Sequence, residues 1–176
     1  MGDRKIYDAK LHKDVEIAET IKIKEIFSKT DIEIVQHPFG DYDIDIGLKL
    51  VNQPVGLIEV ENRKDSWQRG DFPHLSISLL ERKFKYAKRY DKYCLFYLGF
   101  RSDMEDCYVF SSWVLKEFGT KHKIEHRPNS IGSDLKNEYR YSIPVGHAVW
   151  GIDNCVSYIR GSLESYLKIK GQMDGR

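Results

Sequence analysis

Apolar and polar positions along the chain predict an alternation of helices and short strands. In residues 11–29 apolar side chains recur at helical spacing, which indicates an amphipathic helix. These side chains are Leu11, Val15, Ala18, Ile23 and Ile26. Residues 31–36 are rich in β-branched side chains and end at His37-Pro38-Phe39-Gly40, so we expect a strand followed by a turn.

The next two segments, residues 43–51 and 55–61, each alternate between polar and apolar positions and predict a β-hairpin. A three-residue loop at Asn52-Gln53-Pro54 would place Asp45 opposite Glu61, whereas a two-residue turn would put the acids of the two strands on opposite faces. We favour the longer loop, because the other register also splits the apolar rows of the two strands between opposite faces.

Later segments complete an α/β pattern with a mixed sheet flanked by helices. We expect a polar loop at 62–73, helices at 75–90, 111–118 and 156–169, strands at 93–100, 106–110 and 140–143, and a long loop at 119–138. The strand at 93–100 is almost wholly apolar, which is typical of a strand covered on both faces. No linker or repeat divides the chain, so we predict a single domain over 1–176, with a core at about 11–100 and a C-terminal elaboration at about 101–176.

Composition narrows the class of protein. The 176 residues are 41% hydrophobic, which is enough for one core. The 28 basic and 27 acidic residues give a net charge of +1, so any contact with nucleic acid must depend on a local group of basic side chains. Three widely spaced cysteines fit neither a disulfide framework nor a zinc site and favour a reducing compartment. No apolar run is long enough to span a membrane, so we expect a soluble, cytoplasmic protein without a membrane partner.

Four acids on the predicted hairpin carry the candidate chemistry. They are Asp43, Asp45, Glu59 and Glu61. Two unit charges about 4 Å apart repel by roughly 1 kcal/mol even in water, so folding alone gives no reason to gather them on one face. Binding of Mg²⁺, with Mn²⁺ as a substitute, would be a reason to gather the acids, because two such ions can hold the attacking water and the leaving oxygen of a phosphoryl displacement. The plainer alternative is a strand that faces solvent with alternating acids.

The hairpin resembles the core motif of a known enzyme family. Gly40-Asp41-Tyr42-Asp43-Ile44-Asp45-Ile46, followed by Gly56-Leu57-Ile58-Glu59-Val60-Glu61-Asn62, is similar to the motif of the PD-(D/E)xK nuclease superfamily. The order helix, strand, hairpin, helix, strand matches the αβββαβ core of that restriction-endonuclease-like fold. The resemblance implies a Mg²⁺-dependent nuclease, an endonuclease acting on DNA rather than RNA. A nuclease-fold module that only binds nucleic acid or protein is the alternative.

The resemblance also assigns roles to residues. Asp45 and Glu59 match the metal-binding acids, Asp43 is the alternative aspartate, and Glu61 stands where the family usually has lysine, as a third ligand or a proton acceptor. The catalytic lysine is then unassigned, and Lys64, Lys83 or Lys85 could supply its charge. The family's acid from the first helix points to Glu19.

Basic residues around the hairpin are candidates for phosphate contacts. On the helix expected at 75–90 and just beyond it, a cationic stripe of Arg82, Lys85, Arg89 and Lys92 lies opposite the apolar one, with Lys83 beside it. Arg63 and Trp67 could contact a base or a groove, although Trp67 could equally cap the core. His122 and His126 lack a third ligand and are expected at the surface. The sequence leaves a homodimer open.

Overall fold

The computed structural model describes residues 9–41, 43–62, 67, 72–123 and 139–174. Its helices are α1 (Ala9–Phe27), α2 (Glu81–Arg89), α3 (Ser112–Phe118) and α4 (Ile152–Asp174), with a short 3-10 helix at Val145–His147. The strands are β1 (Ile32–Gln36), β2 (Ile46–Leu50), β3 (Gln53–Asn62), β4 (Ser76–Leu80), β5 (Cys94–Phe100), β6 (Cys107–Ser111), β7 (Thr120–Lys123), β8 (Tyr139–Pro144) and β9 (Val149–Trp150).

The described strands form a mixed main sheet and a small second sheet. The main sheet has the order β1-β2-β3-β5-β6-β9, in which only β3 and β5 run parallel. The small antiparallel sheet has the order β4-β8-β7. The elements α1, β1, β2, β3, α2 and β5 follow one another in the predicted αβββαβ order, with β4 inserted before α2. The predicted fold class, a mixed sheet flanked by helices, is confirmed.

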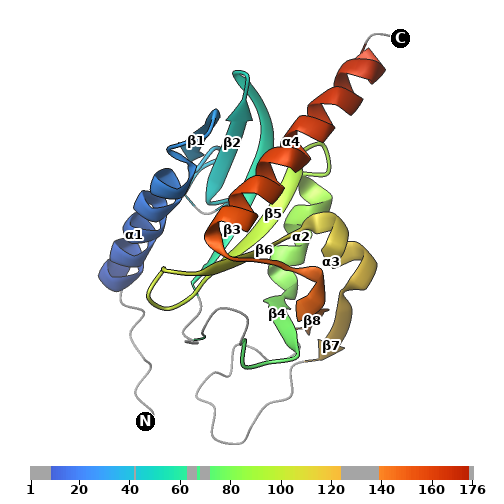
Figure 1. Ribbon diagram of the computed structural model, residues 1–176. Coiled ribbons are helices and arrows are strands. Elements are labelled where there is room, and N and C mark those ends of the chain that lie inside the picture. The colour runs from blue at the N-terminus through green and yellow to red at the C-terminus, as the bar shows by residue number, and fades with distance from the viewer. Residues whose placement is uncertain (1–8, 42, 63–66, 68–71, 124–138, 175–176) are drawn as a thin grey trace, which may run out of the picture.

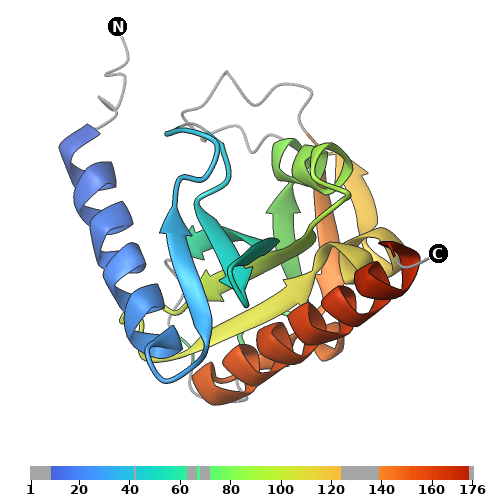
Figure 2. The same cartoon turned by 90° about the horizontal axis from the view of Figure 1, so that it is seen from above.

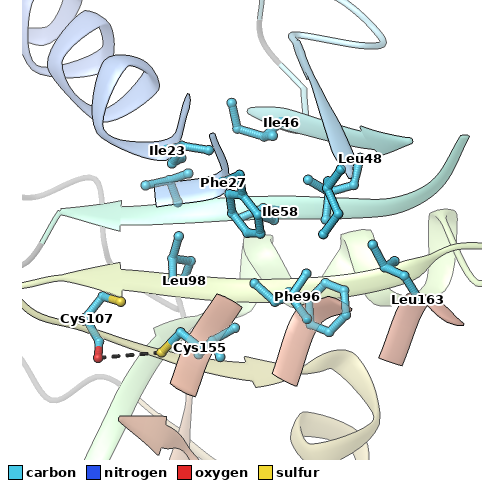
Figure 3. Packing of buried hydrophobic residues seen from close by; sticks show 14 of the residues in the cluster. Ile23, Phe27, Ile46, Leu48, Ile58, Phe96, Leu98, Cys107, Cys155 and Leu163 are labelled. Carbon is cyan, nitrogen blue, oxygen red and sulfur yellow. Dashed lines mark hydrogen bonds between the residues drawn. The ribbon is translucent and has the colours of Figure 1, made fainter. Parts of the chain in front are cut away.

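Helices cover both faces of the main sheet (Figures 1 and 2). On one face, α1 and α4 pack on the sheet through Ile23, Phe27, Ile159 and Leu163 (Figure 3). On the other face, α2, α3 and the small sheet pack against side chains such as Tyr97. Burying apolar surface on both faces provides the main stabilisation of such a three-layer arrangement.

A β-bulge sets the register of the β2–β3 hairpin. Val51 and Asn52 have φ values of 52° and 60°, as in a two-residue type I′ turn. The register next to this turn, Leu50 with Gln53, would pair Asp45 with Ile58 if it continued unchanged. The register shifts by one residue at Leu48/Lys49, so that Ile46 pairs with Ile58. The same register, continued one residue further, brings Asp45 beside Glu59.

The sequence-based register was therefore wrong in detail. The turn lies at Val51-Asn52 rather than at residues 52–54, and Asp45 lies beside Glu59 rather than opposite Glu61. Ile44 was expected on the face of Ile46. It packs instead in the opposite core with Leu57, because β2 begins only at Ile46.

Two other predicted elements need correction. The predicted helix at 75–90 is the strand β4 followed by α2, because Ile77 and Leu79 alternate inward and pair with β8. The first residues of the loop predicted at 119–138 form β7, the edge strand of the small sheet. Both errors concern short strands that depend on distant pairing partners for their hydrogen bonds.

The cysteines form no disulfide bond, and one of them is hydrogen-bonded within the core. All three cysteines are free thiols, and the buried Cys155 donates to the carbonyl oxygens of Cys107 and Val149 (Figure 3). Among the described residues, no helix has the length and apolar character needed to cross a membrane.

Close packing of β3 against α4 gives a first prediction. Replacing Gly56 with Ala should destabilise the protein by about 1–3 kcal/mol in urea denaturation, the usual cost of overpacking a core. The added Cβ would lie 2.6 Å from Cδ2 of the buried Leu163. As a control, nothing lies within 4 Å of a Cβ at Gly161 of α4. Gly161→Ala should therefore stabilise by about 0.5–1 kcal/mol. Unchanged stability of G56A would contradict this packing.

Candidate active site

A half-buried lysine joins two of the candidate acids at the end of β3. Lys83 Nζ lies 2.8 Å from Oε1 of Glu59 and 2.5 Å from Oε1 of Glu61. Glu59 and Glu61 share one face of the strand because they are two residues apart. Lys83 extends toward them from α2, whose start is fixed to the sheet by the Tyr97 hydroxyl, which donates to the Lys83 carbonyl oxygen at 2.9 Å.

Asp45 lies beside this group, at the residue just before the neighbouring strand β2. Its Oδ2 accepts a hydrogen bond of 2.7 Å from the backbone N–H of Val60, the residue between the two glutamates. The bulge described above produces this placement, since without the shift Asp45 would oppose Ile58. Three of the four predicted acids therefore meet around one ammonium group.

Burial controls the protonation of these acids. Glu59 is only 5% exposed, and burial raises its pKa to about 8, although the nearby Lys83 ammonium opposes the shift. Burial also raises the pKa of Asp45, partly offset by the hydrogen bond from Val60. Burial disfavours the Lys83 ammonium, but the combined attraction of Glu59 and Glu61 outweighs it and raises the pKa of Lys83. Lys83 is therefore a cation, and Glu59 keeps its proton to a higher pH than a free glutamate does.

One oxygen of this cluster suits a metal ion. Oε2 of Glu59 is buried and has no hydrogen-bond partner, which is costly for a carboxylate unless a cation or donor completes it. Within the part of the chain that the structure describes, no three Asp, Glu, His or Cys side chains form a metal-binding group. Mg²⁺ does not require such a group, because it is usually held by one or two carboxylates together with water and substrate phosphate. Asp45 and Glu59 fit that requirement.

An acid of the first helix also approaches the site, but it is Glu16. Its Oε1 lies 2.5 Å from Nε2 of His37, and both side chains are close enough to Asp45 to influence its pKa. The backbone N–H of His37 donates to the Asp45 carbonyl oxygen at 2.9 Å. Glu19 lies further along α1 and is half-buried, and a metal-binding role for it stays a prediction.

The stripe of α1 that faces the protein overlaps the predicted one, since Ile23 is buried and Ile26 packs against the same core, whereas Ala18 is exposed. Thr20, Ile23 and Phe27 are buried, whereas Ile17 and Ile21 are exposed. Glu16 continues the buried stripe at the helical spacing of four before Thr20. The spacing of Thr20, Ile23 and Phe27 was the signal in the sequence that could have identified Glu16.

Asp43 has a different partner from the other acids. Its Oδ2 lies 2.9 Å from Nη1 of Arg89, and its Oδ1 accepts from the backbone N–H of Ile44. This ion pair joins the end of α2 to the loop before β2. Asp43 is nevertheless near the cluster, because it contributes, with Glu59 and Asp45, to the raised pKa of the partly buried Tyr86.

The predicted phosphate-binding residues of α2 divide into two groups. Arg82 and Lys85 are exposed, whereas Arg89 is paired with Asp43 and Lys83 is directed into the acids. Arg63, Lys64 and His126 lie outside the described residues. Contacts of the basic residues with nucleic acid stay a prediction.

The remaining candidates have structural roles or lie at the surface. Trp67 is buried, its indole N–H donates to Oδ2 of Asp106, and it packs against Phe72 and Trp150. It caps the core, as the alternative interpretation had it. His122 is exposed on β7, as predicted.

Comparison with known proteins identifies a nuclease of similar structure. No protein-family model matches the chain. No curated protein matches it in sequence. Among solved structures, that of a nuclease from a fusselovirus is similar, with a TM-score of 0.52, 15% identity, and coverage of 94% of this chain and 98% of the viral one. The two proteins share a fold over nearly their full lengths.

The raised pKa of Glu59 predicts how stability depends on pH. The unfolded chain releases this proton near pH 4.5 and the folded chain near pH 8, so the stability gained from the proton is present at low pH and lost as pH rises through about 8. In metal-free buffer the wild type should lose on the order of a few kcal/mol between about pH 5 and about pH 8.5. Urea denaturation across this range measures the loss.

The matched variant is Glu59→Gln, which keeps the shape of the protonated acid and cannot titrate. Its stability should change much less over the same range. Parallel pH profiles of the two proteins would show that Glu59 does not retain its proton in the folded state.

Proposed function

We propose that this chain is a Mg²⁺-dependent nuclease that hydrolyses phosphodiester bonds in DNA. The observation that supports this most directly is the group of Asp45, Glu59 and Glu61 around Lys83. It lies in a fold shared with a nuclease. We further propose that the chain is a variant of the PD-(D/E)xK superfamily, in which Lys83 of α2 supplies the charge of the motif lysine.

Asp45 and Glu59 would hold the metal ion, with Glu61 beside them. When bound, Mg²⁺ would stabilise negative charge on the phosphate and make water a better nucleophile. The unpartnered Oε2 of Glu59 is the oxygen that lacks a cation. The ion would displace the proton that Glu59 otherwise holds, because both bind the same carboxylate.

Lys83 would act as a fixed positive charge. Its raised pKa keeps it protonated, so it cannot accept a proton from water. An ammonium held by two carboxylates needs little reorganisation to stabilise the charge that develops on a phosphate oxygen during attack. Glu61, less buried than Glu59, is the better placed to accept the proton of the attacking water.

Phosphate groups away from the reaction would meet α2. Arg82 and Lys85 project from the same helix as Lys83, and both are exposed. The positive charges of these two side chains would attract the phosphate backbone of a nucleic acid, although the whole chain is nearly neutral. This local charge is what favours nucleic acid as the substrate.

Removing the metal-binding acids should abolish cleavage. We expect Asp45→Asn and Glu59→Gln each to slow the hydrolysis of plasmid, linear and single-stranded DNA in Mg²⁺ by at least about 100-fold. Glu164→Gln, which changes a half-buried acid on α4 that pairs with Arg160, should cleave as the wild type does. Cleavage by E59Q at the wild-type rate would refute the assignment, and binding without cleavage by the wild type would favour a binding module.

Lys83→Met should have opposite effects on metal binding and on catalysis. Without the ammonium, Glu59 and Glu61 are free to attract a cation, so Mg²⁺ should raise the melting temperature of K83M more than that of the wild type. The maximal cleavage rate should fall by about 100-fold, since the charge on the phosphate loses its stabilisation. Lys83→Arg should restore part of the rate. Equal loss of metal binding and rate in K83M would contradict these separate roles.

A further inference from the structure

An apolar cavity lies on the face of the sheet that carries the acids. Its volume is about 290 Å³. Side chains of the β1–β2–β3 sheet, the loop after β1 and the segment after α2 surround it, and they include Val35, Pro38, Phe39, Leu57, Lys49 and Tyr93. Leu57 and Glu59 are two residues apart on β3 and point to the same face, which puts the cavity about 7 Å along the strand from the acid.

Aromatic rings form one wall of this cavity. Phe39 is 44% exposed although it is a large apolar side chain. Its ring stacks on Tyr90, with centroids 4.8 Å apart and planes at 7°, and lies 6.0 Å from the ring of Tyr93. The stack holds Phe39 in place and leaves it accessible to a further planar group.

Cations surround the aromatic wall. The Arg89 guanidinium lies 5.2 Å from the centre of the Tyr90 ring, and Lys92 Nζ lies 5.5 Å from that of Tyr93. Lys49 lines the cavity itself, with its Nζ 2.7 Å from Oε1 of Glu33. An apolar cavity with aromatic walls and a cationic rim complements a nucleotide, whose base is planar and apolar on its faces and whose phosphate is anionic.

The loop that carries Phe39 is also part of the candidate active site. Two residues earlier, the His37 N–H donates to the Asp45 carbonyl oxygen, and the Gly40 N–H donates to the His37 carbonyl oxygen. Phe39 is therefore held at a fixed place relative to Asp45. A base against Phe39 would help to position the phosphate of a neighbouring nucleotide at the acids.

We propose that this cavity binds the base of a nucleotide next to the scissile phosphate. The inference rests on the proposed nuclease function and deepens it. A base inside the cavity has its edges against lining residues such as Val35, Pro38 and Leu57 rather than against a partner base, so the substrate is a strand with at least one unpaired base. The preferred substrates are then single strands, flaps or frayed ends rather than blunt duplexes.

Binding of oligonucleotides to E59Q with Ca²⁺ tests the proposal without cleavage. A short single-stranded DNA is compared with copies in which one base at a time is replaced by an abasic site. Adding Phe39→Ala should weaken binding of the intact strand by about 10-fold. At one position the abasic strand should bind both proteins equally, because the base that contacts Phe39 is already missing. Phe39→Trp should bind like the parent.

The matched control is Trp113→Ala, which removes an aromatic side chain on α3 that is 63% exposed. It should leave binding unchanged. If F39A weakened binding equally on the intact strand and on every abasic strand, or not at all, the cavity would not be a base-binding site. This experiment distinguishes failure of the base-binding proposal from failure of the proposed nuclease function. Coupling between Phe39 and one base would be measured even if the wild type cleaved no DNA.

Discussion

The placement of one ammonium group between the buried carboxyl of Glu59 and the half-buried carboxylate of Glu61 is the interaction on which the rest of this structure depends. Glu59, Glu61 and Asp45 lie together where water is scarce, and burying an unpaired charge costs several kcal/mol. Lys83 is the cation that makes this arrangement compatible with folding. Because Lys83 belongs to α2, its ion pairs also fix the helix over the end of β3, and the hydrogen bond from Tyr97 holds the same turn to the sheet. The position of α2 and the charge of the cluster are therefore coupled.

The sheet brings these groups together through its register. Side chains alternate along a strand, so a shift of one residue moves every acid to the other face. The tight turn at Val51-Asn52 would by itself set the wrong register for Asp45. The bulge in β3 adds one residue and reverses that effect. The apolar rows of β2 and β3 depend on the same residue, because Ile46 and Ile58 both pack under α1 and α4 only after the shift. Core packing and site geometry thus impose the same constraint on the hairpin.

Periodicity in the sequence was enough to predict the order of the core elements and the acids of the hairpin, since both depend on local alternation. It could not locate the tight turn, because a left-handed Val51 followed by Asn52 has no Gly to signal it, and it therefore missed the bulge that corrects the register after this turn. It missed β4, since Ile77 and Leu79 also fit a helix and only pairing with β8 decides between the two. It did not point to Glu16, because two neighbouring stripes of α1 are apolar, and only the packing of Thr20, Ile23 and Phe27 shows which of them faces the sheet. Lys83 was one of three candidate lysines, and no pattern in the sequence says which of them points inward.

Stability alone does not account for the cluster. Three carboxylates and one ammonium leave two negative charges in excess when all are ionised, and apolar residues of similar volume often stabilise such a site better than buried charges do. Without a metal ion, a proton on Glu59 removes part of the excess, and burial together with the charges of Asp45 and Glu61 raises the pKa of that group. A divalent cation would remove all of it and would occupy the side of Glu59 that has no partner. A proton and a metal ion would thus compete for one carboxylate, which the fold keeps buried and incompletely paired. This is the state expected of a side chain whose partner arrives with the substrate.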